Sequence, residues 1–542
     1  MTRLIRPPLR RSHLLTGLLA GCLAGLVLLT TASAATAKTY FPTRTDDPAP
    51  NGCTKKDCSL REAVIAANAS GGGKIVLRPG KRYELTRQGA GENDALTGDL
   101  DLKAPTAVTT KGKRGDPATI DANGIDRIFE GSPVLDRVIL RDGHARVTPG
   151  DNGNGGAVLG RAQVIDSRFI HNTADGRGGA IYIDSGQGQI RKSRFKGNRA
   201  ASDGGAIYLA SPCMGLPPGA LTFWGSRAAH NSAGGNGGAI FSYCLAWLSN
   251  SYLGDNSARG AGGGLFSPGS AIPPEAVTHD PTQWSSRVVM FGTTVTGNDA
   301  RSFGGGIALD AGALSSEISS STISGNSTAA SGGGVGINAP AAKPTVSLAM
   351  ENSTLANNQA GRDAGGIGTA DAAVGFGSHA TVSLNHATIA RNQANTALES
   401  GAQRAGLGGG IYEEDRDSFS VHNTLVALNT VATFHAPQPS DCATGFGNPF
   451  QSLGHNLIGN PVGCQGFGAA GDLFGGKLKL GKLAKNGGPT KTIALGKGSR
   501  AINRADTPGT VSDTYDQRDY SRYKRPDIGS YEWRGKPRAK KK

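Results

Sequence analysis

The stretch Ser193-Arg-Phe195-Lys-Gly-Asn198-Arg-Ala-Ala-Ser-Asp-Gly-Gly-Ala206-Ile207 decides the fold, because its pattern recurs through the middle of the chain. Each copy has a hydroxyl or small residue, a residue of apolar type two positions later, an Asn three positions further on, and then a Gly pair. Offsets inside the unit are constant while the distances between units vary, which is typical of a solenoid with one constant turn and variable loops. The Asn members are Asn172, Asn198, Asn231, Asn256, Asn298, Asn326, Asn358, Asn392 and Asn429.

The roles of these positions follow from strand geometry. The hydroxyl and apolar positions lie two residues apart, so they share one face of a strand, and we expect both to point into the core. The Asn tolerates a left-handed turn, and Asn side chains stacked in register can form an amide ladder. The Gly pair permits tight turns and close packing of coils. Parallel strands joined by long crossovers fit the pattern and a hairpin-linked sandwich does not, so we predict a parallel β-helix over residues 118–430.

The N-terminus predicts export. Four arginines within residues 3–11 precede an apolar stretch over residues 14–29, and small residues follow. This order is typical of a secretory signal peptide, which we assign to residues 1–37. Cys22 lies in a sequence that also resembles a bacterial lipobox, but the apolar run continues past it. We therefore expect a secreted or cell-surface protein rather than a lipoprotein, with no transmembrane segment once the signal is removed.

The cysteines and charges are consistent with an extracellular protein. Six cysteines remain after signal removal, and an even number in an exported chain predicts disulfides. They form three local pairs: Cys53 with Cys58, Cys213 with Cys244, and Cys442 with Cys464. Of the formal net charge of +15, four charges lie in the signal peptide and six in a basic tail, residues 534–542, which leaves an ordinary +5 for the body. The charge therefore gives no argument for a nucleic-acid partner.

The sequence of residues 38–117 is typical of a cap on the first coils. Ser59 and Glu62 are spaced as a capping box at the start of a helix, and apolar residues follow on one face. Gly71-Gly72-Gly73 ends this helix, and short β-rich segments follow. An open solenoid end exposes unpaired strand edges and apolar core, so we expect the helix to cover that end.

Three segments carry a resemblance to known families. Cys58-Ser-Leu-Arg-Glu-Ala63 resembles the N-terminal signature of bacterial CSLREA-domain proteins, and the Gly-Gly-Ala-Ile repeats resemble those of polymorphic outer-membrane proteins. The C-terminal stretch is similar to the choice-of-anchor Q module. The resemblance implies an all-β, right-handed parallel β-helix of the pectin-lyase-like type, with a C-terminal module over residues 431–533 that closes the coil. It carries no agreed catalytic residues.

Charged residues in the loop between the Asn and the Gly pair are the first candidate site. Coil stacking would align them along one ridge, which could bind an acidic extracellular polysaccharide or a cell-surface glycan through guanidinium groups. The carboxylates could alternatively coordinate Ca²⁺, and a solvated edge with no ligand or cofactor explains the same charges. The arginines are Arg177, Arg259, Arg301, Arg362 and Arg404, and the aspartates are Asp175, Asp203, Asp299 and Asp363.

An acidic run after Gly410-Ile411-Tyr412 is the second candidate site. Parallel β-helices host polysaccharide lyases and glycosidases, and glycosidases need paired carboxylates. We expect an exposed edge strand here, with an active or metal site as the alternative. The residues are Glu413, Glu414, Asp415 and Asp417.

The preferred function is adhesion or extracellular glycan binding without catalysis, by a monomeric surface or secreted protein. One alternative is a polysaccharide lyase or glycosidase that acts on an acidic extracellular polysaccharide. A second alternative is a structural envelope protein. Clustered carboxylates in a long groove would favour the enzyme, whereas a polar ridge without them would favour binding or a structural role.

Overall fold

The structure is a computed structural model. It describes residues 38–89, 91–112, 115–210, 220–269, 286–310, 315–339, 346–369, 380–397, 407–414, 417–445, 449–506 and 514–538. The predicted signal peptide, with Cys22, and the last four residues of the basic tail lie outside them. No helix in the described part of the chain combines the length and the apolar character that crossing a membrane requires.

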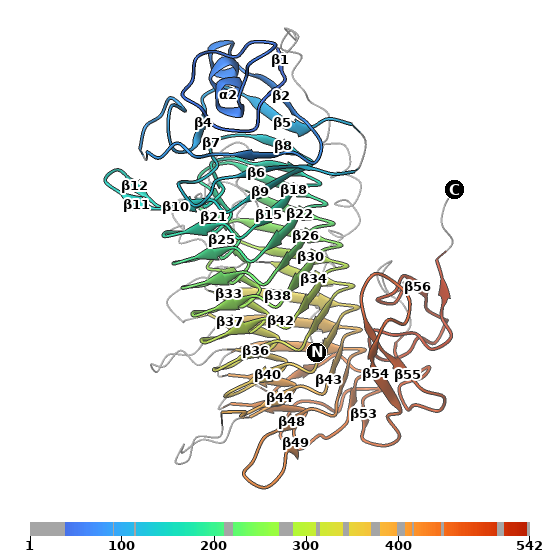
Figure 1. Cartoon of the computed structure of the whole chain (residues 1–542). Coiled ribbons are helices and arrows are strands. Elements are labelled where there is room, and N and C mark those ends of the chain that lie inside the picture. The colour runs from blue at the N-terminus through green and yellow to red at the C-terminus, as the bar shows by residue number, and fades with distance from the viewer. Residues whose placement is uncertain are drawn as a thin grey trace, which may run out of the picture. The chain divides into compact units, whose positions relative to one another are not determined.

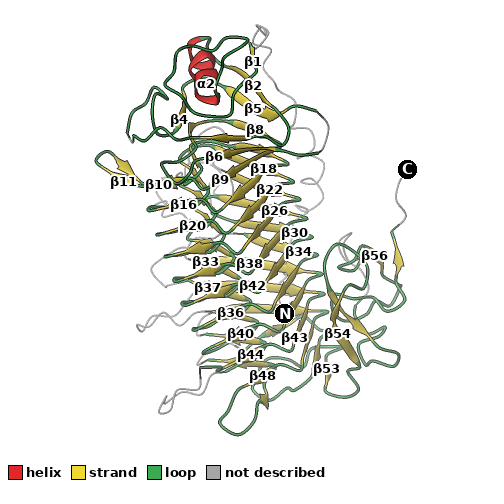
Figure 2. Cartoon of the chain, in the orientation of Figure 1, coloured by secondary structure: helices red, strands yellow, loops and turns green. Residues whose placement is uncertain are grey.

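The strands stack into four long, almost entirely parallel sheets that form a right-handed parallel β-helix (Figure 1). Two sheets have 14 strands each and the others have 12 and 11. One coil contains β17 (Ile181–Ile183), β18 (Gln187–Arg191), β19 (Arg194–Lys196) and β20 (Arg199–Ala200). Each pairs in parallel with its counterpart in the next coil: β21 (Ile207–Leu209), β22 (Ala220–Trp224), β23 (Arg227–Ala229) and β24 (Ser232–Ala233). Strands and loops dominate Figure 2, so the predicted all-β fold is confirmed.

A single helix covers the N-terminal end of the described coil. It is α2 (Leu60–Ala69), which lies beside β1 (Thr39–Tyr40) and β2 (Gly73–Leu77) at the top of Figure 1. Ser59 is its N-cap, and both hydrogen bonds of the capping box with Glu62 are present. The apolar face packs inward because its side chains extend the core: Leu60, Ala63, Val64 and Ala67. The sequence predicts this helix correctly.

Arg61 connects this helix to the loop that precedes β4 (Leu100–Leu102). Its guanidinium is fully buried and donates to both carboxylate oxygens of Asp47, at 2.8 and 3.0 Å. A buried charge is costly unless it is paired and its donors are satisfied. The remaining donors are satisfied by backbone carbonyl groups of Ala95, Thr97, Gly98 and Asp99.

The predicted amide ladder is present along the whole repeat. From Asn172 to Asn392, each Asn donates its side-chain Nδ2 to Oδ1 of the Asn in the next coil, at 2.8–2.9 Å. Asn429 donates instead to Asp441. The predicted left-handed conformation, however, falls on the residue before the Asn, as at His171 (φ 55°) and His230 (φ 56°). The Asn must point inward to reach the next coil, so its neighbour makes the turn.

The Gly pair has two separate functions. Gly204, at φ +68°, takes the left-handed turn that favours glycine. A Cβ on Gly205 would lie 2.1 Å from the carbonyl oxygen of Gly238 in the next coil. The first Gly therefore turns the chain and the second permits the coils to approach.

The sheets extend beyond residues 118–430 at both ends. They begin at β1 and β2, inside residues 38–117, to which the sequence assigns the cap and the first strands, and the last strand is β53 (Leu473–Phe474). Long parallel pairing thus includes segments whose sequences lack the Asn and Gly-Gly unit. The pattern marks the regular coils and underestimates the length of the solenoid.

The C-terminal segment after β53 forms a side module. We expect from the sequence that it closes the end of the coil, but its hairpin of β54 (Leu480–Ala484) and β55 (Thr492–Leu495) packs on the outer face of earlier coils, beside the lower strands in Figure 1. Gln517 donates to the backbone of Ser321, and Thr354 donates to Gln517. The expected end cap is therefore wrong for this segment, because alanines on that outer face pack against its apolar side chains and hydroxyl groups there bond its polar ones.

Two of the predicted disulfides lie within the described residues, and both are formed. Cys53 pairs with Cys58, and Cys442 pairs with Cys464. For the third predicted pair, Cys244 is fully buried and Cys213 lies outside the described residues.

Candidate functional site

A column of arginines runs along the outer face of one sheet. Arg168 in β15 (Arg168–Ile170), Arg194 in β19 and Arg227 in β23 are direct partners in adjacent parallel strands. All three are exposed, because side chains alternate along a strand and the next residue points into the core. Those buried neighbours are Phe169, Phe195 and Ala228. The alternation therefore presents three guanidinium groups outward at the strand spacing of about 4.8 Å.

Aromatic rings lie beside these cations. Tyr252 follows Arg227 in the same column, and the Arg227 guanidinium carbon lies 3.7 Å from the centre of its ring. The Lys192 ammonium lies 5.4 Å from the centre of the Trp224 ring. Cation–π contacts of this kind orient a charged side chain without neutralising it.

The column forms the floor of a groove of about 720 Å³. Turn residues before each strand form part of its lining, including Asp166 and Lys192. At one end it is bounded by Asp116 and Arg137, and at the other by Pro489 of the side module. The groove therefore lies on the part of this outer face that the side module leaves open.

The groove carries an excess of positive charge. Two carboxylates line it, Asp116 and Asp166, against five cations. Within the described part of the chain, neither Arg168 nor Arg194 takes part in an ion pair. Like charges directly opposite each other in neighbouring strands destabilise a sheet, so an anionic ligand would relieve a repulsion that the fold contains. The five cations are Arg137, Arg168, Lys192, Arg194 and Arg227.

The sequence contains a signal for this site at a position that is not constant in the repeat. In three consecutive units the residue just before the inward apolar position is Arg. The position varies further along the chain, where Tyr252, Thr294 and Thr322 occupy the same column. A search for constant positions therefore misses it, whereas reading each column separately would have found it.

The predicted arginine ridge is not a single row. Arg259 and Arg301 each lie three residues after a ladder Asn and share a column, whereas Arg362 lies four residues after its Asn and Arg177 five. Backbone pairing keeps these loop positions in register, so different offsets place the side chains in different columns. The prediction that all align is wrong for these four arginines, and Arg404 lies outside the described residues.

The four predicted aspartate ligands do not form a group. Asp203 accepts from the backbone of Asn236, and the buried Asp363 accepts from the backbone of Leu407. Asp175 bonds His144, and Asp299 accepts from Ser327. Their hydrogen bonds go to turns and neighbouring coils, so the sequence-based Ca²⁺ site has no assembled ligand set among these residues.

Two members of the acidic run after Gly410, Glu413 and Asp417, are buried rather than exposed. Glu413 ends β45 (Ile411–Glu413), which pairs with strands on both sides, and its side chain is 1% exposed. Burial, together with the nearby Asp417 carboxylate, raises the pKa of Glu413 to about 8. Asp417 is also buried and accepts from the backbone of Ala380, while Glu414 is half-buried. The expected exposed edge is therefore wrong, and Asp415 lies outside the described residues.

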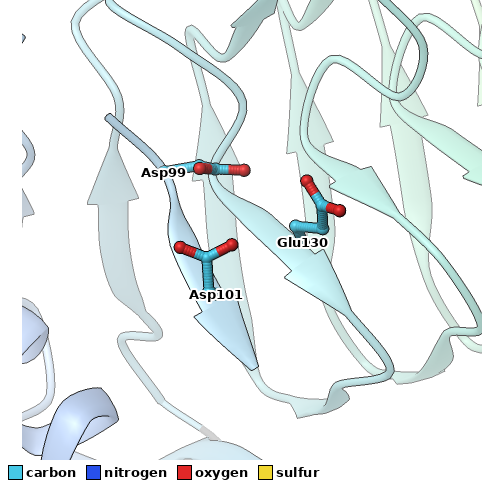
Figure 3. A group of neighbouring side chains, drawn as sticks. All are labelled: Asp99, Asp101 and Glu130. Carbon is cyan, nitrogen blue, oxygen red and sulfur yellow. The ribbon is translucent and has the colours of Figure 1, made fainter. Parts of the chain in front are cut away.

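A different carboxylate group lies near the N-terminal cap. Asp99, Asp101 and Glu130 bring their oxygens within 4.8 Å of one another from adjacent strands (Figure 3). Burial raises the pKa of Asp101 to about 6 and that of Asp99 well above its ordinary value. Arg127 donates to Glu130 at 2.9 Å and to Asp99 at 3.4 Å. The guanidinium supplies the positive charge here, so the group fits a structural role.

Two solved structures are similar to this chain at low sequence identity. The A-module of the mannuronan C-5 epimerase AlgE6 from Azotobacter vinelandii is 14% identical with a TM-score of 0.35, covering 77% of this chain and 90% of that one. The pectate lyase Pel9A is 12% identical with a TM-score of 0.32, covering 92% and 97%. Comparison with curated proteins gives no match. The model of the Chlamydia polymorphic membrane protein repeat matches residues 166–184 and 192–210, and these two repeats carry Arg168 and Arg194.

Proposed function

We propose that this chain binds an acidic extracellular polysaccharide in the arginine groove, without catalysis. The observation that carries the proposal is the column of Arg168, Arg194 and Arg227, held in register on three adjacent strands. Guanidinium groups bind carboxylates and sulfates through paired hydrogen bonds. A row of them at strand spacing suits a linear polymer with one acidic group on each sugar, and Tyr252 offers a ring on which a sugar can lie.

The positions of the carboxylates favour binding over hydrolysis. Buried side chains such as Glu413 and Asp417 cannot contact a polymer on the surface. Glycoside hydrolysis needs two carboxyl groups that flank the same bond. The groove offers Asp116 at the edge of its N-terminal end and Asp166 in a turn, from different coils.

The proposal includes a location outside the cell, either at the surface or in secreted form. Its support is the basic, apolar and small-residue order of residues 1–37 and the match of two repeats to a family described as polymorphic membrane proteins. Adhesion through a glycan is the role that fits such a location.

The test compares two triple variants with equal changes of charge. Arg168, Arg194 and Arg227 are replaced by Gln in one, and Arg259, Arg301 and Arg362 in the other. Retention of the mature protein on polygalacturonate, alginate and neutral dextran is measured at two salt concentrations. We expect the groove variant to lose retention on the acidic polymers by 100-fold or more, at about 2 kcal/mol for each charged hydrogen bond lost, while the control keeps it.

Two results would contradict this proposal. Equal retention of the groove variant and the wild type would remove the groove as the binding site, and selective loss in the control variant would support the loop arginines instead. Release of unsaturated products that absorb ultraviolet light would establish a lyase and overturn the non-catalytic assignment.

A further inference from the structure

The hairpin of the side module carries a dense row of lysines. Between Leu473 and Ala505 the chain has eight cationic residues and no Asp or Glu. All eight are exposed. Six are lysines: Lys477, Lys479, Lys482, Lys485, Lys491 and Lys497. The net charge of residues 38–533 is an ordinary +5 and conceals this lysine-rich segment. Its local charge of +8 is offset by acidic residues elsewhere in the chain.

The packing of the hairpin directs these lysines away from the coil. Leu480, Leu483 and Ile493 form its inner side and pack on Ala356 and Ala390 of the β-helix. Lys479 directly precedes Leu480 and Lys482 directly precedes Leu483, and neighbouring residues of a strand point to opposite faces. The cations are therefore held on the outer side of a docked, ordered element rather than on a free tail.

The lysines are also available for a partner. Lys479 donates to the backbone carbonyl of Lys497 at 3.0 Å, a contact that leaves both charges in place. Among the described residues, none of the six forms an ion pair. Arg500 is held by the carbonyl groups of Phe474 and Gly475, and Phe474 is 38% exposed beside it. The patch thus combines unneutralised ammonium groups with an exposed ring at its border.

The composition of the patch selects the kind of anion. Lysine is a compact, flexible point charge, whereas specific recognition of carboxylates or nucleic-acid bases favours arginine and stacked aromatic rings. No aromatic residue lies between Lys477 and Arg504. Polybasic clusters without such features bind the diffuse negative charge of anionic lipid headgroups, at about fivefold in affinity for each lysine.

We propose that this lysine face docks the protein on an anionic lipid surface. The phosphate groups of the lipids neutralise the row of ammonium groups, and Phe474 contacts the headgroup region. The arginine groove meets the side module at Pro489 but contains none of the six lysines, so the two surfaces use separate sets of cations. This inference does not depend on the groove.

The experiment measures sedimentation of the mature protein with vesicles. Phosphatidylglycerol vesicles are compared with phosphatidylcholine vesicles, at low salt and at about 1 M salt, where charges are screened over about 3 Å. The test variant replaces Lys477, Lys482, Lys485 and Lys497 by Gln. The control replaces four exposed cations of the coil by Gln: Lys74, Arg259, Arg301 and Arg362.

We expect salt-sensitive binding to the anionic vesicles alone, lost beyond detection in the lysine variant and retained in the control. Equal binding to both vesicle types, or undiminished binding of the lysine variant, would overturn the proposal. Equal loss in the control would also overturn it, because net charge would then explain the result. Binding of soluble polyphosphate without binding of vesicles would exclude a lipid partner. Retention on acidic polysaccharide, measured in parallel, reports on the groove separately.

Discussion

Asn429 donates both its backbone amide and its side-chain Nδ2 to Oδ1 of Asp441, each at 2.9 Å. Every earlier ladder Asn makes the same two bonds to another Asn. The other oxygen of Asp441 accepts from the backbone of Asn460 at 2.6 Å. The ladder therefore ends on a carboxylate whose two oxygens both accept hydrogen bonds. An amide has only one oxygen and could not replace it.

Replacing this carboxylate by an amide should weaken the end of the coil. In Asp441→Asn, an NH₂ group would face the N–H of Asn460, and this half-buried donor would lose its acceptor. We expect a loss of about 1–3 kcal/mol in the free energy of unfolding, measured by urea titration. The exposed Asp519→Asn is the matched control and should change it little. An unchanged midpoint for the Asp441 variant would show that the end of the ladder is not under this constraint.

Glu413 should make the protein less stable as the pH rises. Its pKa is about 8 in the folded protein against an ordinary 4.5, so the folded state holds a proton that the unfolded state releases. The stabilisation is complete below about pH 4.5 and is lost as the pH rises through about 8. Burial acts in the same direction on Glu532, whose pKa rises to about 7. Glu413→Gln should flatten the dependence of unfolding midpoints on pH between about 5 and 9, and an equally steep dependence would contradict this origin.

Arg61→Lys should loosen the N-terminal cap while the coil stays folded. A lysine has three donors at one point and cannot match the two oxygens of Asp47 together with the four carbonyl groups that Arg61 bonds. We expect a local loss of about 3–5 kcal/mol, as for a broken buried ion pair. Limited proteolysis should then cut between Thr86 and Asp99. The exposed Arg82→Lys serves as control, and equal resistance of both variants would refute the prediction.

Gln517→Glu should detach the side module from the coil. Its Nε2 donates to Ser321, Thr322, Thr490 and Lys491, and a carboxylate in this buried place would face oxygen atoms. We expect a cost of at least about 3 kcal/mol and a thermal transition that separates from that of the coil. Gln438→Glu makes the same change at an exposed position and should leave a single profile. Identical profiles for the two variants would show that Gln517 does not hold the interface.

The sequence predicts what every coil must repeat. Asn172 and its successors are recognisable because each amide must meet an identical amide, and the inward Phe169 and Phe195 follow from alternation along the strand. The sequence predicts the left-handed turn one residue too late, because the preference of Asn for that conformation does not reveal that its side chain must point inward.

The candidate sites were harder to predict because they depend on pairing between distant segments. Glu413 looks like an edge residue until β50 (Cys442–Thr444) pairs beside it. The loop arginines look aligned in the sequence because their offsets from the ladder Asn, three to five residues, differ so little. The groove of Arg168, Arg194 and Arg227 is not evident from the repeat, because other residue types occupy the same column further along the axis. The net charge of the whole chain conceals the lysine face.

The docking of the side module sets an order of events during synthesis. Coils that contain Ser320 to Thr388 bond to partners that lie 142 to 196 residues later in the chain. At about 5–20 residues per second, the side module emerges roughly seven to forty seconds after the coils that it contacts. During that interval the outer face that the module will cover is open to solvent and to other chains. The side module therefore completes the fold last. In a chain truncated before Thr490, the outer face of the coils in the C-terminal half would stay permanently exposed.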